Sequence, residues 1–533
     1  MNRARPITPL LLSQCIIFAS LLLLSALALL SQTPNYWELD WIWDNEKLLP
    51  FDHLYLANAG ASLLTFNLAR IPSLAPDYGL AWLMQGFWND IRQQYLGYLI
   101  LQSCIQLALG SWIVQQIARL GSLPSLAIFA TVSYALGSIS PAWATNHSLA
   151  ALPLNHGGNL CLVLLIFALS LKAMLGTQSR SLSIGLGLSV LVASLSNRIS
   201  VLQAVLPAFL LFALPELTPV CRRNRQQICI WIASCTGLGL ALSKLALKTG
   251  CTPPLQWNWD DLARHLSRLF SLQPWHLGLG YWITINLLLC IGLFWKSERT
   301  ATKAYGFLIG SSSVLSLLLY PFILSNQGLS DDNLRYLLPT LSSIPITASL
   351  FIGFALRRHS SWTNPFCIGC ALALSIVVLN PESPFGQVKQ FTNAFLQWEN
   401  PYSQFLRENL PEGGAVLTAS DGNYLLSSRS LKAGTNWGIH VSQIASNGNP
   451  NPWDQGKAEF FENQSNKTLR RYNAILIPSK DHDQAMLWYG KPKQIIEDQE
   501  LGVELGIYGA EGQQEIARRL AQEFKGSFRI HCL

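Results

Sequence analysis

A short run of acidic and aromatic residues, WELDWIWD at positions 37–44, follows the first hydrophobic segment of the chain. Large rings beside a carboxylate exclude water, which raises the pKa of the carboxyl group toward that of a useful general base, and a second acid in the same site raises it further. Glu38, Asp40 and Asp44 are therefore candidate catalytic residues. The alternative is a solvated loop whose aromatic rings anchor the chain at a membrane surface.

A second candidate site is the sequence NHGGN at positions 155–159, which precedes another hydrophobic segment. Its two glycines allow a ligand or a neighbouring backbone to come close. Asn155 and His156 are therefore candidate substrate-binding residues. The alternative for His156 is an ordinary histidine at the membrane interface.

A third candidate site is the sequence DDNLRYLLP at positions 331–339. The planar guanidinium of Arg335 can hold a phosphate through parallel hydrogen bonds, and Tyr336 can pack on a lipid or a sugar. Both are predicted to bind the phosphate of a substrate. Asp331 and Asp332, at the start of the run, are predicted to bind substrate.

Arg198 lies between two short hydrophobic segments, 181–196 and 199–217. A single charge near membrane depth is costly unless it has a partner or water, so Arg198 is a further candidate for phosphate binding. An interfacial arginine without a binding role is the alternative. The two short segments are either separate spans or one broken, re-entrant element.

The elements that must position these residues are hydrophobic segments. The chain has 533 residues, of which 50% are hydrophobic and 13% charged, and its mean hydropathy is +0.27. This composition is that of an integral membrane protein. About eleven segments have the length and composition to span a bilayer: 10–30, 95–118, 123–140, 158–176, 181–196, 199–217, 226–248, 277–296, 304–324, 335–356 and 362–380.

Basic residues occupy alternate connections between these segments. They follow the second segment at Arg119, the sixth at Arg222 and the tenth at Arg357, and Arg3 and Arg5 precede the first. The positive-inside rule then predicts a cytoplasmic N-terminus and external loops that carry the candidate sites. Because the basic residues lie beside hydrophobic spans and form no single patch, membrane lipids are the expected partner and nucleic acid is not.

The remaining chain divides into two parts. Within a transmembrane domain of residues 1–380, the first external loop, 31–94, is predicted to hold two interfacial helices at 54–70 and 79–92, separated by helix-breaking Pro72 and Pro76. Residues 381–533 have the composition of a soluble domain. Two short buried strands at 414–419 and 473–478 and a helix at 512–524 predict a small external α/β domain.

Cysteine chemistry is not indicated. Cys367 and Cys370 form a CxxC inside a hydrophobic segment with no second pair nearby, so no metal site is predicted there. Cys251 and Cys532 both fall on the predicted external side, and whether they pair is left open. Residues 1–30 also resemble a signal peptide, although an uncleaved anchor is expected because many spans follow.

This layout resembles the GT-C glycosyltransferases, and within them the bacterial relatives of protein mannosyltransferases and of the aminoarabinose transferase that acts on lipid A. The likeness rests on Glu38 and Asp40 after the first span, on Arg335, Tyr336 and Pro339 at a late span, and on the arrangement of spans and domains. One departure is that Glu38-Leu39-Asp40 replaces the adjacent Asp-Glu pair of the family. Alternate residues of an extended chain face the same side, so both acids can still share a site.

The resemblance implies a bacterial inner-membrane enzyme that transfers a sugar from a polyprenyl-phosphate donor to an envelope acceptor, which is a lipid, a glycan or a protein. It implies that Glu38 or Asp40 is the base, that Asp44 supports it, and that Arg335 and Arg198 hold the phosphate. No nucleotide is expected, and a role for a divalent metal is left open. The alternative is a non-catalytic or transport protein that binds glycans or partners through its external loops, but the nearly uncharged span interiors argue against transport.

Overall fold

The structure is a computed structural model of the full chain, and it describes most of the membrane part and a portion of the C-terminal part. The described residues are 9–32, 74–139, 143, 150–152, 157–175, 180–217, 220–247, 267, 269–270, 278–324, 336–380, 393, 401–409, 415–418, 436–438, 472–479, 482–483, 486 and 490–509.

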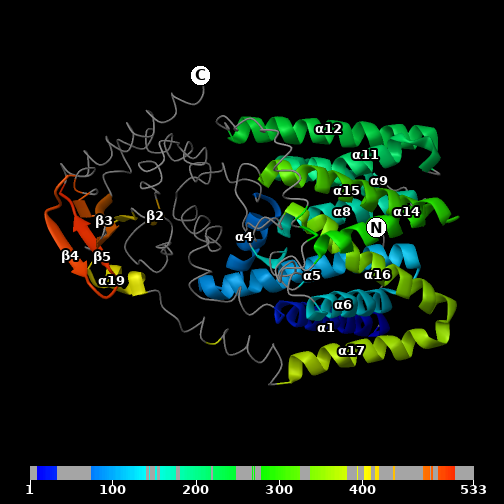
Figure 1. The fold of residues 1–533 in the computed structure, drawn as a ribbon, viewed down its shortest axis with the longest axis horizontal. Coiled ribbons are helices and arrows are strands. Elements are labelled where there is room, and N and C mark those ends of the chain that lie inside the picture. Colours follow the sequence, from blue (N-terminus) through cyan, green and yellow to red (C-terminus); the bar gives the residue numbers. More distant parts are fainter. Residues whose placement is uncertain are drawn as a thin grey trace, which may run out of the picture.

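The membrane part is a bundle of apolar helices, which makes the chain a multi-pass membrane protein (Figure 1). Within the described residues, nine helices are long and apolar enough to span a bilayer, and two shorter apolar helices, Arg180–Ser196 and Val201–Ala213, accompany them. Together they match the predicted segments. The bundle helices are α1 (Pro9–Leu30), α5 (Ile91–Ala118), α6 (Ser122–Ile139), α8 (Gly157–Met174), α9 (Arg180–Ser196), α11 (Leu206–Ala213), α12 (Arg222–Leu247), α14 (Leu279–Lys296), α15 (Thr300–Leu324), α16 (Leu338–Arg358) and α17 (Thr363–Leu379).

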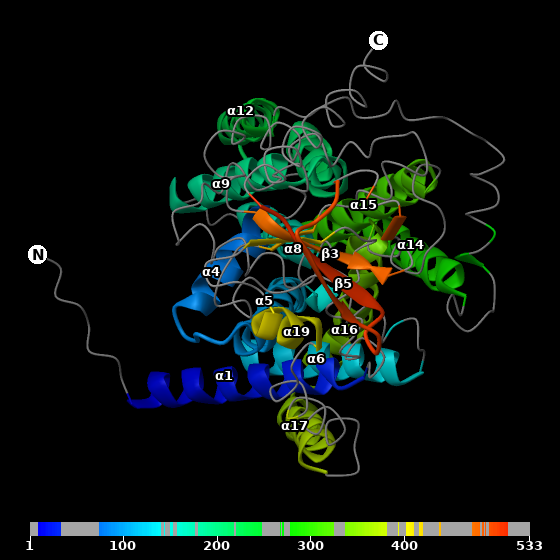
Figure 2. The same cartoon turned by 90° about the vertical axis from the view of Figure 1, so that its left-hand side faces the viewer.

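Helix α8 lies at the centre of the bundle, and α17 lies at its edge (Figure 2). In α8, 83% of the spanning segment is buried by other helices, whereas in α17 the fraction is 11%. The reason is that α8 packs on α5, α9, α15 and α16. Lipid therefore faces most of α17, and the start of α8 is enclosed by protein.

Charge distinguishes the two ends of the bundle. Basic residues gather where α5, α8, α14 and α16 end and where α9, α12 and α15 begin, which we call the cationic end. They are Arg119, Lys172, Arg180, Arg222, Arg223, Arg225, Lys296, Arg299, Lys303, Arg357 and Arg358. The opposite end, where α5, α8 and α16 begin, is called the loop end. The described basic residues there are Arg92, which forms an ion pair with Asp90 at 2.6 Å, Arg198 and Lys244.

The segment around Arg198 forms two elements and a sharp reversal. Helix α9 ends at Ser196, and Asn197 caps the short helix α10 (Arg198–Ser200) by accepting a hydrogen bond from the Ile199 amide at 2.9 Å. A π-helical turn, η5 (Val201–Val205), then leads into α11. Both α9 and α11 contact α12, and α11 leads back toward the cationic residues at the start of α12. The predicted segment 199–217 therefore returns toward the cationic end as a broken span.

The second predicted interfacial helix is shorter than expected. A π-helical turn, η4 (Leu74–Tyr78), precedes α4 (Gly79–Gln85), and Ile91 and Arg92 already belong to α5. Helix α4 ends at Gln85, and Asp90 is the N-cap of α5, because its side chain accepts a hydrogen bond from the Arg92 amide at 2.8 Å. Pro76 lies within η4 and does not interrupt it. The predicted helix 54–70 lies outside the described residues.

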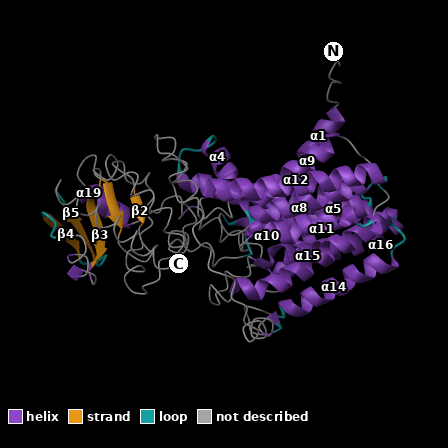
Figure 3. Cartoon of the chain, turned by 90° about the horizontal axis from the view of Figure 1, so that it is seen from above, coloured by secondary structure: helices purple, strands orange, loops and turns teal. Residues whose placement is uncertain are grey.

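The C-terminal part contains a five-stranded sheet in the order β2-β1-β3-β5-β4, beyond the loop end of the bundle (Figures 1 and 3). Strands β1 (Ala415–Thr418) and β3 (Tyr472–Pro478) lie where the sequence predicts strands, and they pair in parallel. Strands β2 (Asn436–Gly438), β4 (Gln494–Asp498) and β5 (Val503–Ile507) complete the sheet. The predicted helix 512–524, Cys251 and Cys532 lie outside the described residues.

One face of this sheet is covered by the amphipathic helix α19 (Pro401–Asn409). Phe405 and Leu406 of α19 form a small hydrophobic core with Leu476 of β3 and with Val503 and Leu505 of β5. Alternate strand residues face the same side, so this core explains the periodicity of β3 and β5. The small α/β fold that the sequence predicts for the C-terminal part is confirmed.

The other face of β5 carries an ion pair between Glu504 and His482. His482 Nδ1 lies 2.5 Å from Glu504 Oε2, and Glu497 lies directly opposite Glu504 on β4. The hydrogen bond and the charge of Glu504 raise the pKa of His482, and the nearby Asp483 and Glu497 act in the same direction. The pair relieves repulsion between acids on neighbouring strands.

Stability of this sheet is expected to decrease as pH rises. A raised folded pKa means that the contribution of His482 is complete below its unfolded pKa of about 6.5 and is lost as pH rises through the folded value. Hydrogen-exchange protection of the β5 amides in the full-length protein should therefore decline as pH rises through the raised folded pKa of His482. In Glu504→Gln the decline should be absent, and an unchanged pH dependence in that variant would contradict the assignment.

Candidate functional site at the loop end of the bundle

The predicted site residues divide into those that the structure describes and those that lie outside it. Tyr336 is described, and Arg198 begins α10, with its backbone described. The predicted residues outside the described part are Glu38, Asp40, Asp44, Asn155, His156, Asp331, Asp332 and Arg335. The helices that flank these residues are described, so the structure shows which predicted segments come together.

Four segments that are far apart in the sequence meet around the start of α8. Helix α8 begins at Gly157, one residue after His156, and contacts η4, α10, η5 and α16. Turn η4 ends the first loop, α10 begins with Arg198, and α16 begins just after Arg335. The elements that adjoin three of the predicted sites, at His156, Arg198 and Arg335, therefore meet in one small region of the loop end, together with the end of the first loop.

A buried carboxylate lies in this region. Asp77 of η4 is 1% exposed, and the Tyr98 hydroxyl donates a hydrogen bond to its Oδ1 at 2.6 Å. Tyr98 also contacts the side-chain oxygen of Gln102, whose Nε2 donates to the carbonyl of Ala150 at 2.7 Å. This hydrogen-bonded chain joins the end of the first loop to α5 and to the connection between α6 and α8.

The two glycines of NHGGN allow this close packing. A Cβ atom on Gly158 would lie 2.3 Å from Asp77 Oδ1 and 2.8 Å from Pro76 Cδ, and one on Gly157 would lie 1.9 Å from the Ala150 carbonyl oxygen. Both distances to oxygen are far below contact distance. Asp77 therefore lies against the first turn of α8, where the helix dipole favours a negative charge. In the described structure, the neighbour that approaches these glycines is the protein itself.

A second set of hydrogen bonds joins the other predicted segments. Asn159, in the first turn of α8, donates through Nδ2 to the Gln203 Oε1 of η5 at 3.4 Å. Gln203 donates through Nε2 to the carbonyl of Tyr336 at 2.8 Å. Gln203 is 1% exposed and Tyr336 is 7% exposed, with its ring in the hydrophobic core. Tyr336 takes part in this network through its backbone carbonyl and not through its ring.

One acceptor in the first turn of α8 has no hydrogen-bond partner among the described residues. It is Oδ1 of Asn159, in a side chain that is 4% exposed. A buried polar atom that stays unpaired costs about 1–3 kcal/mol. Such an oxygen is suited to accept a hydrogen bond from a sugar hydroxyl or from a guanidinium group.

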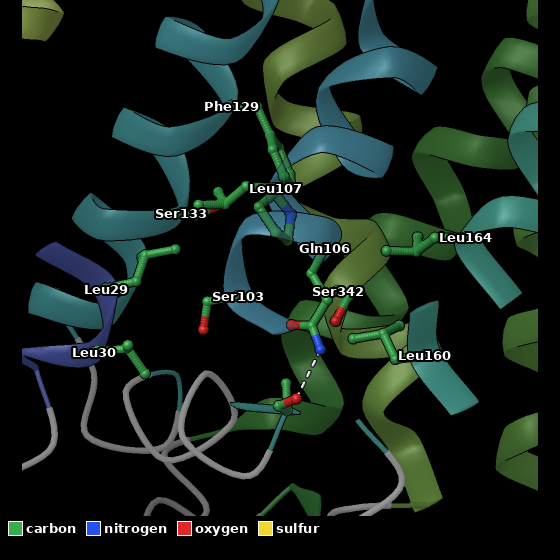
Figure 4. Close-up of a pocket in the computed structure, with 12 residues that line it drawn as sticks. Leu29, Leu30, Ser103, Gln106, Leu107, Phe129, Ser133, Leu160, Leu164 and Ser342 are labelled. Atoms are coloured by element: carbon green, nitrogen blue, oxygen red, sulfur yellow. Dashed lines mark hydrogen bonds between the residues drawn. The ribbon is translucent and has the colours of Figure 1, made fainter. Parts of the chain in front are cut away.

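A small cavity of about 40 Å³ lies next to these networks (Figure 4). It is enclosed mainly by leucines of α1, α5 and α8, with Ser103, Gln106, Ser133 and Ser342 as its polar members. Gln106 donates a hydrogen bond to the Ala150 carbonyl at 2.7 Å. A cavity of this kind needs about 10–15 Å³ to hold one water molecule, so this cavity has room for water.

Sequence reasoning did not single out Asp77 or the polar side chains of α5. Gln94, Tyr98, Gln102 and Gln106 repeat every four residues and so form one stripe on this helix. That spacing is a signal the sequence does contain. Asp77 has no such pattern around it, and no cluster of three or more metal-binding side chains occurs among the described residues.

No protein-family profile matches the chain, and no curated protein sequence matches it. Among solved structures, the fold is similar to ArnT from Cupriavidus metallidurans, which was crystallised with undecaprenyl phosphate. The two chains share 11% sequence identity with a TM-score of 0.48, over 94% of this chain and 99% of that one.

Proposed function

We propose that this protein transfers a sugar from a polyprenyl-phosphate donor to an acceptor of the cell envelope, and that it does so at the loop end of the bundle. The observation that supports the proposal is the meeting of four segments around the start of α8. Three of these segments adjoin Asn155 and His156, Arg198, and Arg335, and the fourth, η4, ends the loop that carries the acids of residues 37–44 at its beginning.

The roles follow from the chemistry of such a transfer. The phosphate is already a good leaving group, so the remaining tasks are to deprotonate an acceptor hydroxyl and to neutralise the phosphate charge. Glu38 or Asp40, supported by Asp44, would act as base. Arg335 and Arg198 would hold the phosphate, and the free acceptor oxygen of Asn159 would take a sugar hydroxyl.

The proposed orientation follows from the charges at the two ends. The cationic end carries arginines and lysines from seven helices or their caps, so it would face the cytoplasm under the positive-inside rule. The loop end and the α/β domain of residues 381–533 would then be external, in the inner membrane of a bacterium. A lipid-linked donor suits this place because its tail stays in the bilayer, and no soluble nucleotide is required there.

A transfer assay tests the proposal. Purified protein in lipid nanodiscs, supplied with radiolabelled polyprenyl-phosphate sugars and envelope extract, should transfer label. Arg335→Ala should lower kcat/KM for the donor by roughly ten- to a hundredfold, since hydrogen bonds to a charged group contribute about 1.5–3 kcal/mol. Arg299→Ala, which removes an exposed arginine at the cationic end, is the matched control and should keep full activity.

Two outcomes would count against the proposal. If no polyprenyl-phosphate sugar gives labelled product with the wild-type protein, the chain is not this type of transferase. If the two arginine variants lose the same activity, the phosphate is not bound at the loop end.

A further inference from the structure

Gln203 lies in an unusual backbone turn. Residues 201–205 form a single π-helical turn between α10 and α11, which changes the direction in which the side chains of this segment point. Isolated π-helical turns occur often at functional sites. The turn lies between Arg198 and the rest of the sixth span and packs against α8 and α15.

Both polar atoms of the Gln203 side-chain amide form hydrogen bonds. Its Oε1 accepts from Asn159 at 3.4 Å, and its Nε2 donates to the Tyr336 carbonyl at 2.8 Å. The side chain is 1% exposed, so these bonds replace the water that it loses on burial. A leucine would fill a similar volume without that desolvation. The amide is therefore suited to holding particular atoms in place, a task beyond filling space.

The atom that Gln203 holds is next to the proposed phosphate-binding arginine. The Tyr336 carbonyl belongs to the residue after Arg335, and residues 336–337 form the first turn that leads into α16. A bond at this carbonyl fixes where the chain enters the helix. It also ties that point to α8 through Asn159.

We infer that Gln203 is a positioning residue that sets the location of Arg335 relative to the start of α8, and so controls binding of the donor phosphate. This inference rests on the proposed function. Gln203 acts through the Tyr336 carbonyl and does not itself contact the donor. Because the phosphate is bound in the ground state as well as in the transition state, its misplacement should appear mainly in the donor KM.

The matched control for this inference is Gln116 of α5. Its Nε2 donates to the Ala168 carbonyl at 3.2 Å, which is the same kind of bond, but it lies near the cationic end. Gln203→Leu and Gln116→Leu each remove one such bond from the bundle. Gln203→Glu keeps the size of the side chain and an acceptor, but places an oxygen against the Tyr336 carbonyl.

Two measurements on the full-length protein in nanodiscs test the inference. Gln203→Leu and Gln203→Glu should raise the donor KM at least about tenfold with kcat within about threefold, because small displacements of a binding group have large effects. Undecaprenyl phosphate should also stabilise these variants less against heat than it stabilises the wild type. Gln116→Leu should resemble the wild type in both measurements.

The outcomes separate this inference from the proposed function. If the wild-type protein transfers sugar and Gln203→Leu behaves like Gln116→Leu in KM and in stabilisation by undecaprenyl phosphate, the positioning role is wrong. A wild-type protein with no transfer and no stabilisation by undecaprenyl phosphate would overturn the proposed function itself. Should Gln203→Leu fold poorly, Gln203→Glu still tests the bond to Tyr336.

Discussion

Changing Glu38 to Gln or Asp40 to Asn should lower sugar transfer by about 10²–10⁴-fold, which is the usual contribution of a general base. Each substitution keeps the shape of the side chain and removes its ability to take a proton. The one that carries the base should lose kcat while the donor KM stays nearly constant. Single-turnover transfer with saturating donor measures this loss directly.

The matched control is Glu298→Gln, which alters an acid in the short connection between α14 and α15 at the cationic end. It should leave transfer unchanged. The structure also supplies the rival assignment, because Asp77 is a buried carboxylate attached to the same region. If transfer survives in the Glu38→Gln, Asp40→Asn double variant and is lost in Asp77→Asn, the base is Asp77 and the assignment to the run at 37–44 is wrong.

Replacing Gly158 with Ala should destabilise the bundle and greatly reduce transfer. The new Cβ would lie 2.3 Å from Asp77 Oδ1 and 2.8 Å from Pro76 Cδ, so η4 must move away from α8. Overpacking of this kind costs about 1–3 kcal/mol. The movement would also shift the end of the first loop. That loop is expected to carry the catalytic acids, at residues 37–44 near its beginning. Thermal unfolding in nanodiscs and the transfer assay together measure both effects.

Gly292→Ala is the control for this substitution. Gly292 lies in α14, and no atom lies within 4 Å of the position that a Cβ would take, so alanine there should leave both stability and transfer unchanged. A double-mutant cycle with Asp77→Ala then measures the contact itself, since neighbouring residues give non-additive changes. Additive losses in the cycle, or wild-type stability in Gly158→Ala, would show that η4 does not pack on α8 as described.

Much of the fold could be predicted from local patterns in the amino-acid sequence. The hydrophobic segments have the length that a bilayer requires, and each span satisfies its own backbone hydrogen bonds, so its position depends little on its neighbours. Strands β1 and β3 were predictable for a similar reason, because short apolar runs bounded by turns indicate strands. The less local prediction at 79–92 was only partly right, since α4 ends at Gln85 and Asp90 begins a new helix as the N-cap of α5.

The sequence predicted the candidate site residues only separately, without showing which of their segments come together. Arg198, Arg335 and His156 could be proposed as site residues from their residue types and from their places beside hydrophobic segments, and these assignments stay predictions. Nothing in their local sequence shows that their segments meet around α8, because helix contacts in a bundle depend on the packing of all its members. Asp77 was missed for the same reason. Its partner Tyr98 is 21 residues away and belongs to another helix.

The amino-acid sequence by itself determined the number of spans, their alternation, the end that carries the positive charge, and the α/β character of the C-terminal part. These properties depend on segment length, composition and periodicity, which are local. Only the tertiary structure decided that Asp77 packs on Gly158 and that Gln203 joins Asn159 to Tyr336. Such contacts connect residues from different helices, and the buried polar groups that form them can be paired only after the helices have packed.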